Sequence, residues 1–178
     1  MRIMIRIISP LFAVLALIGP ASFAGAQPTL HFSAGIGDGH SAYYDLYAQQ
    51  TFKPLETWET CELVPLANIG LTAWHDNDGN ETVFGLIGAL GLKLSFYGDT
   101  YRPFILLSGG PSFISSDEFV GRDLGSKFIF NTHARLGLDF GAEFKHHFDV
   151  HATHYSNAHT SRDNDGYNAL GLAYGYSF

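Results

Sequence analysis

The chain has 178 residues, of which 46% are hydrophobic, 15% are aromatic and only 15% are charged, well below the quarter that is usual in a soluble domain. The single cysteine, Cys61, excludes an internal disulfide, and the formal charge of −7 argues against nucleic acid as a partner, because binding phosphates needs clustered Lys and Arg.

The first 26 residues have the pattern of a secretory signal peptide. Arg2 and Arg6 precede an apolar run over residues 7–19, and Ala24-Gly25-Ala26 has the small-x-small form that a signal peptidase cleaves. A transmembrane helix, the alternative, needs about 20 apolar residues, but Ser9-Pro10 breaks this run and it stops early. We expect residues 1–26 to be a signal peptide and residues 27–178 to form one exported domain.

After residue 27 the chain alternates between large hydrophobic residues and small or polar ones, and this period of two predicts strands. In the last strand Leu170 and Leu172 alternate with Ala169 and Gly171, as in a small barrel with lipid outside and little room inside. Turn-forming Gly, Asp and Asn separate most of the segments. The eight predicted strands are residues 29–37, 41–52, 63–74, 82–96, 102–114, 127–140, 143–157 and 167–178.

The expected fold class is all-β: an eight-stranded antiparallel transmembrane β-barrel of the bacterial outer membrane. A soluble eight-stranded barrel, the alternative, would turn its large residues inward. With both termini in the periplasm, the connections near residues 38–40, 75–81, 115–126 and 158–166 lie outside the cell. We expect segment 53–62 to be a loose periplasmic turn that holds Cys61. We also expect an aromatic girdle that includes Tyr43, Tyr44, Tyr47 and Trp74.

The seventh predicted strand carries polar residues on its lipid-facing side. Phe148 and Val150 assign the even positions to lipid, so His154 and Ser156 also point outward, near the extracellular end. Residues i and i+2 lie roughly 6.6 Å apart on one face of a strand, which lets the imidazole reach the hydroxyl as a base reaches an activated serine. Asn168 begins the last strand with the same parity, where it could orient the imidazole.

Of two other interpretations of these residues, a polar collar stays open and a metal site is excluded by parity. A tolerated polar collar at the membrane rim would place the same residues there without any chemistry. A metal site is not expected, because His147 and His151 have the parity of the lumen, whereas His146 and His154 have outward parity. We expect neither a metal nor another cofactor.

The stretch His154-Tyr155-Ser156-Asn157-Ala158 resembles the catalytic stretch of the outer-membrane lipid A 3-O-deacylases, the PagL family. The similarity continues at residues 102–105, 124–126 and 164–166 and covers most of the chain after residue 26. The resemblance implies a serine esterase in the outer membrane that removes the ester-linked 3-hydroxyacyl chain from position 3 of lipid A. Lipid A or lipopolysaccharide would be its substrate, and the protein would be a monomer or homodimer.

The resemblance also implies roles for single residues. Ser156 would be the nucleophile, His154 the general base, and the backbone N–H of Asn157 a donor to the oxyanion. The triad glutamate of the family is replaced by Asn168, and the usual glycine after Asn-Ala is replaced by His159.

The two replacements leave open how active the protein is. Asparagine can orient a histidine but supplies no negative charge, so we expect slower chemistry unless Asp163 or Asp165 supplies the charge. Two alternatives for the function stay open: an inactive relative of the family, and a non-catalytic structural or adhesive small outer-membrane barrel whose extracellular loops bind. Phe104 either lines an acyl groove or packs as an ordinary lipid-facing residue.

Overall fold

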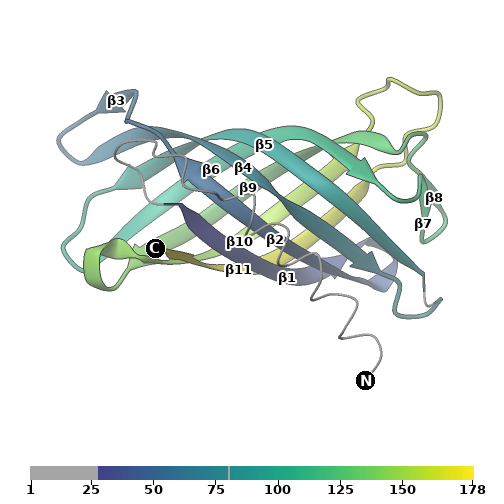
Figure 1. Ribbon diagram of the computed structural model, residues 1–178, viewed down its shortest axis with the longest axis horizontal. Coiled ribbons are helices and arrows are strands. Elements are labelled where there is room, and N and C mark those ends of the chain that lie inside the picture. Colours follow the sequence, from purple (N-terminus) through teal and green to yellow (C-terminus); the bar gives the residue numbers. More distant parts are fainter. Residues whose placement is uncertain (1–27, 80) are drawn as a thin grey trace.

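The computed structural model describes residues 28–79 and 81–178, so the predicted signal peptide lies outside the described residues. Eight long antiparallel strands form a closed barrel (Figure 1), which confirms the predicted fold class. Their order is β2-β1-β11-β10-β9-β6-β5-β4, and β2 pairs with β4 to close the wall. The strands are β1 (Thr29–Gly37), β2 (Ser41–Thr51), β4 (Cys61–His75), β5 (Thr82–Phe96), β6 (Tyr101–Ile114), β9 (Phe128–Phe140), β10 (His146–Ser156) and β11 (Tyr167–Ser177).

Short elements decorate both ends of the barrel. The turns η1 (Asp38–His40) and η2 (Ala142–Phe144) join β1 to β2 and β9 to β10. Strand β3 (Glu56–Thr57) lies at the end that holds the C-terminus, and the hairpin of β7 (Glu118–Phe119) and β8 (Arg122–Asp123) lies at the opposite end (Figure 1). None of the described residues forms a helix that is long and apolar enough to cross a membrane.

Two predicted boundaries were wrong. Segment 53–62 is no loose turn, because β3 pairs with the start of β4 and Cys61 is already paired with Phe96 of β5. The strand predicted over 143–157 begins only at His146, since Glu143 and Phe144 have φ values of 54° and 55°, in the left-handed region that a strand does not use.

The predicted alternation between lipid side and lumen side is confirmed in the last strands. On β11 Leu170 and Leu172 are 62% and 53% exposed, whereas Tyr167, Ala169 and Ala173 at positions of the other parity are buried. The outer wall is therefore a band of exposed apolar side chains, as expected of a barrel surrounded by lipid and opposite to a soluble barrel.

The lumen is filled by aromatic side chains toward the end that carries β7 and β8. Trp74 stacks on Tyr167 with ring centroids 4.3 Å apart, and Phe119 from the β7–β8 hairpin packs against both rings. The girdle prediction was wrong for Tyr43, Tyr47 and Trp74, which are all buried in the lumen.

A period of two could not decide the direction of these rings, because both faces of β2 carry tyrosine. Of its tyrosines, Tyr44 is the one that is exposed. The same ambiguity affects Phe104, which is buried on the lumen side with Leu66 and Leu106 and so neither lines an outer groove nor faces lipid.

Candidate active site

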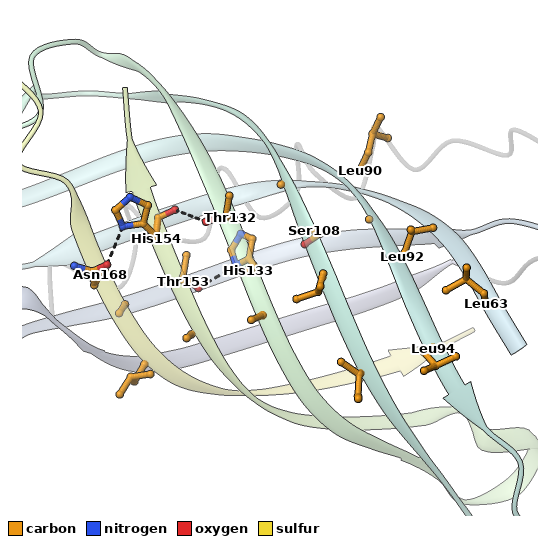
Figure 2. Close-up of a pocket in the computed structure, with 18 residues that line it drawn as sticks. Leu63, Leu90, Leu92, Leu94, Ser108, Thr132, His133, Thr153, His154 and Asn168 are labelled. Atoms are coloured by element: carbon orange, nitrogen blue, oxygen red, sulfur yellow. Dashed lines mark hydrogen bonds between the residues drawn. The ribbon is translucent and has the colours of Figure 1, made fainter. Parts of the chain in front are cut away.

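The histidine and the asparagine predicted to act together lie opposite each other on the outer wall. His154 and Asn168 are direct partners in the antiparallel ladder of β10 and β11, and both side chains are exposed. His154 Nδ1 lies 2.8 Å from Asn168 Oδ1 (Figure 2). An amide oxygen only accepts, so Nδ1 carries the proton and Nε2 keeps its lone pair for a proton from elsewhere.

Asn168 has a second polar neighbour that the sequence did not suggest. Its backbone N–H and its side-chain Nδ2 donate to Asp38 Oδ2 at 2.9 and 3.0 Å. Asp38 begins the turn after β1, and the ladder of β1 and β11 ends at the pair Gly37–Ala169, so the next positions along both strands are Asp38 and Asn168. A prediction of the register between β1 and β11 would have revealed this contact.

The two loop aspartates expected as alternatives serve the loops instead. Asp165 Oδ2 accepts the backbone N–H of Asp123 at 2.9 Å. Asp163 contributes its backbone carbonyl, which accepts from Asn157 Nδ2 at 2.6 Å. Among the hydrogen bonds of the described residues, neither carboxylate reaches His154 or Asn168.

Ser156 occupies the predicted outward position at the end of β10, two residues after His154. It is half-buried and lies opposite Phe130 of β9. The hydrogen bonds of the described residues include none between Ser156 Oγ and His154. Both residues have the outward parity and lie at the same end of β10.

Asn157 is fully buried and ties two extracellular loops together. Its Nδ2 donates to Leu124 O at 2.8 Å as well as to the carbonyl of Asp163. Its backbone N–H, the predicted oxyanion donor, donates to Asn164 Oδ1 at 2.9 Å. The N–H is therefore engaged within the loop 157–166 in this structure.

The same loop closes over the edge of the histidine. Gly166 has φ 67°, and a Cβ at this position would lie 3.0 Å from His154 Cε1, so glycine lets the loop approach the ring. Arg122 holds the loop from β8, with Nη1 donating to the carbonyls of Asp165 and Gly166 at 3.2 and 3.3 Å. His159, where the resembling family usually has glycine, has φ 63°, a conformation that favours glycine.

An apolar groove of about 1110 Å³ runs across the outer wall from this site. Figure 2 shows His154 and Asn168 at one end and Leu63 and Leu94 at the other. Small residues, Ala152 of β10, Ala134 of β9 and Gly109 of β6, lie along the groove. Neighbouring strands are about 4.8 Å apart, so the path from β10 to β5 spans roughly 14 Å, which suits an extended acyl chain.

Comparisons with known proteins match most of the chain that carries this site. The family model described as lipid A 3-O-deacylase (PagL) matches residues 42–177. The lipid A deacylase PagL of Bordetella bronchiseptica is 28% identical over 95% of this chain and 96% of the relative. The lipid A deacylase PagL of Pseudomonas aeruginosa is 29% identical over 91% of this chain and 94% of the relative.

A solved structure gives the same result for the fold. The crystal structure of the outer membrane enzyme PagL superimposes with a TM-score of 0.77 at 26% identity, over 84% of this chain and 99% of that chain. The family model runs from β2 to the end of β11, so its match includes the strands that carry His154, Ser156 and Asn168. The chain belongs to the PagL family of outer-membrane lipid A 3-O-deacylases.

Proposed function

We propose that Ser156 and His154 perform on the outer wall the ester hydrolysis for which the family is named. The protein is a lipid A 3-O-deacylase of the outer membrane, a carboxylic ester hydrolase whose substrate is lipid A or lipopolysaccharide. The observation that carries the assignment is the His154–Asn168 pair at the head of an apolar groove that faces lipid. The acyl chains of lipid A already lie beside this wall, so the substrate reaches the groove by lateral diffusion.

The reaction follows the serine-hydrolase scheme. Ser156 Oγ attacks the carbonyl carbon of the ester at position 3, and His154 Nε2 takes the hydroxyl proton. His154 then returns the proton to the departing sugar oxygen, which leaves an acyl group on Ser156. Water, deprotonated by His154, attacks this second ester, and His154 returns the proton to Ser156 Oγ as the 3-hydroxy fatty acid leaves.

The contact between Ser156 and His154 forms when the ester occupies the groove. Nucleophile–base hydrogen bonds are often long or absent without substrate and tighten once it is bound. Nε2 is available for this contact, because the interaction with Asn168 holds the proton on Nδ1.

Asn157 contributes through its backbone rather than through its side chain. The two donors of Nδ2 are occupied by the carbonyls of Leu124 and Asp163 inside the loops. Only the N–H remains for the oxyanion, and it exchanges Asn164 Oδ1 for the charged ester oxygen as the tetrahedral intermediate forms.

The groove and all the proposed catalytic residues come from one chain, so a monomer is sufficient for the reaction. A homodimer is compatible with it if the wall from β5 to β11 stays open to lipid. Light scattering of the detergent-solubilised protein would distinguish the two states.

Mass spectrometry of lipid A from cells that express the wild type, Ser156→Ala or His154→Ala tests the proposal. We expect loss of one 3-hydroxyacyl chain with the wild type alone, at equal amounts of folded barrel. Unchanged lipid A from all three strains would instead favour a structural or adhesive barrel. Deacylation that survives Ser156→Ala would assign the nucleophile elsewhere.

A further inference from the structure

The site has a histidine oriented by an amide, yet a histidine base normally relies on a carboxylate to stabilise the imidazolium ion that forms during the reaction. We propose that Asp38 restores this missing charge and acts as a positioning residue through Asn168. This inference rests on the proposed function, since it concerns how His154 is held and charged during ester hydrolysis.

The first argument is the direction of the amide group of Asn168. A carboxylate oxygen only accepts hydrogen bonds, so the side-chain Nδ2 of Asn168 must face Asp38 Oδ2, at 3.0 Å. The amide oxygen is thereby turned toward His154 Nδ1, at 2.8 Å. Asp38 thus fixes the amide, and the amide in turn fixes the proton of His154 on Nδ1.

The second argument is that Asp38 is held in place by the fold. Its Oδ2 also accepts the backbone N–H of Asn168 at 2.9 Å, where the ladder between β1 and β11 has just ended. Gly37 before it allows a close approach, since a Cβ there would lie 1.9 Å from Tyr167 Oη. Ser41 Oγ donates to the Asp38 carbonyl at 2.8 Å and closes the turn.

The third argument concerns charge. Asp38 is one quarter exposed, and Arg122 Nη2 lies 3.4 Å from its Oδ2. This distance exceeds those to Asn168, so Asn168 makes the shorter hydrogen bonds to the carboxylate and the arginine forms a longer ion pair with it. When His154 becomes an imidazolium, the chain of two hydrogen bonds connects it to a negative charge, and each bond is polarised by the next.

Asp38 therefore replaces, from the opposite side of Asn168, the carboxylate that the family places directly beside the histidine. The loop residues Asp163 and Asp165 do not fill this role: Asp165 Oδ2 accepts from the backbone of Asp123, and among the hydrogen bonds of the described residues neither carboxylate reaches His154 or Asn168. The site becomes a chain of four side chains: Ser156, His154, Asn168 and Asp38.

The decisive experiment is a two-by-two comparison of purified protein acting on lipid A. In the native background Asp38→Asn keeps an acceptor but removes the charge, so we expect kcat to fall roughly tenfold with KM unchanged. In an Asn168→Glu background the glutamate supplies the charge itself, and the Asp38→Asn substitution should change kcat by less than about twofold or raise it, because a like charge is removed.

A merely structural Asp38 would give a different pattern. Equal losses of activity in both backgrounds, or no loss in the native one, would overturn the inference. Asp78→Asn, an exposed aspartate in the β4–β5 turn, is the matched control for net charge at this end and should leave kcat unchanged. A wild type without activity on lipid A would overturn the proposed function itself, which separates the two failures.

A spectroscopic measurement tests the same contact without catalysis. In ¹⁵N-histidine NMR of the detergent-solubilised Ser156→Ala protein, the signal that disappears in His154→Gln belongs to His154. We expect this signal to report a proton on Nδ1, and Asp38→Ala to move part of the population to the Nε2–H tautomer, since Asn168 is then free to turn. An unchanged tautomer in Asp38→Ala would contradict the proposed positioning.

Discussion

Strand β10 carries His147 on its lumen face and His154 on its outer face, and each is accompanied by a serine, Ser177 or Ser156. In the lumen, His147 Nδ1 lies 2.7 Å from Asp139 Oδ1 and its Nε2 lies 2.8 Å from Ser177 Oγ, the full set of contacts of a Ser-His-Asp triad. On the outer face, His154 is paired with the amide of Asn168, and Ser156 lies two residues further along the strand.

The inner triad is nevertheless arranged as a structural network. Ser177 Oγ is also 2.8 Å from Thr29 Oγ1, and its backbone N–H donates to the carbonyl of Lys145. Lys93 Nζ lies 2.5 Å from Asp139 Oδ2 and neutralises the carboxylate. The outer set has an apolar groove for the acyl chain and, through Asp38, an acid within two hydrogen bonds. Residue types alone therefore do not distinguish the two sets; the proposed active site differs from the inner one in its access to lipid and in the partners of its acid.

Covalent labelling shows directly which of the two serines, Ser156 or Ser177, is activated. A fluorophosphonate forms a covalent bond with an activated serine, and we expect peptide mass spectrometry to find it on Ser156 and not on Ser177. His154→Ala should reduce labelling by at least about 100-fold, because the base is removed, whereas His147→Ala should leave it unchanged. An adduct on Ser177 would reverse the roles of the two faces.

The inner network should instead contribute to stability. In Asp139→Asn the ammonium group of Lys93 loses the carboxylate it is paired with while it stays buried, so we expect the free energy of unfolding to fall by about 3 kcal/mol. Urea unfolding of the folded barrel in detergent measures this. The exposed pair of Glu143 and Lys145 is the control: Glu143→Gln should have no measurable effect. A similar loss in both variants would show that burial is not the cause.

The groove can be blocked without touching the polar residues. Ala152 lies opposite Ala134 in the wall, so Ala152→Trp fills the groove beside His154. We expect kcat/KM on lipid A to fall roughly tenfold, with hydrolysis of a short-chain ester retained. Val150→Trp, on the same face of β10 but outside the groove, is the matched control. Equal losses on both substrates would indicate damage to the catalytic residues instead.

The smallest effect is expected in the outer loop. His159 has φ 63°, so His159→Gly relieves a left-handed conformation and should raise the free energy of unfolding by about 1 kcal/mol. Thr160→Gly should lower it, because the Thr160 hydroxyl donates to the carbonyl of Asn157 at 2.7 Å. Thermal unfolding of the two variants in detergent tests both signs, and a destabilised His159→Gly would contradict the explanation.

The sequence by itself determined the eight strands, the direction of most side chains on β10 and β11, and the juxtaposition of His154 with Asn168. These follow from alternation along a strand and from a hairpin that joins neighbouring strands, both of which are local in the chain. It also placed Ser156 on the outer wall, since parity continues from Val150 and Ala152.

Two features became visible only in the folded barrel: the rings that fill the lumen, and the carboxylate that lies beside Asn168. Tyr43, Tyr47 and Trp74 turned inward although their strands allowed either face, because the closed barrel needed large rings to fill its interior. Asp38 lies 130 positions before Asn168 and meets it only because β1 pairs with β11 when the barrel closes. A contact made by the first and last strands leaves no local pattern in the sequence, and so the contact of Asp38 with Asn168 was visible only in the fold.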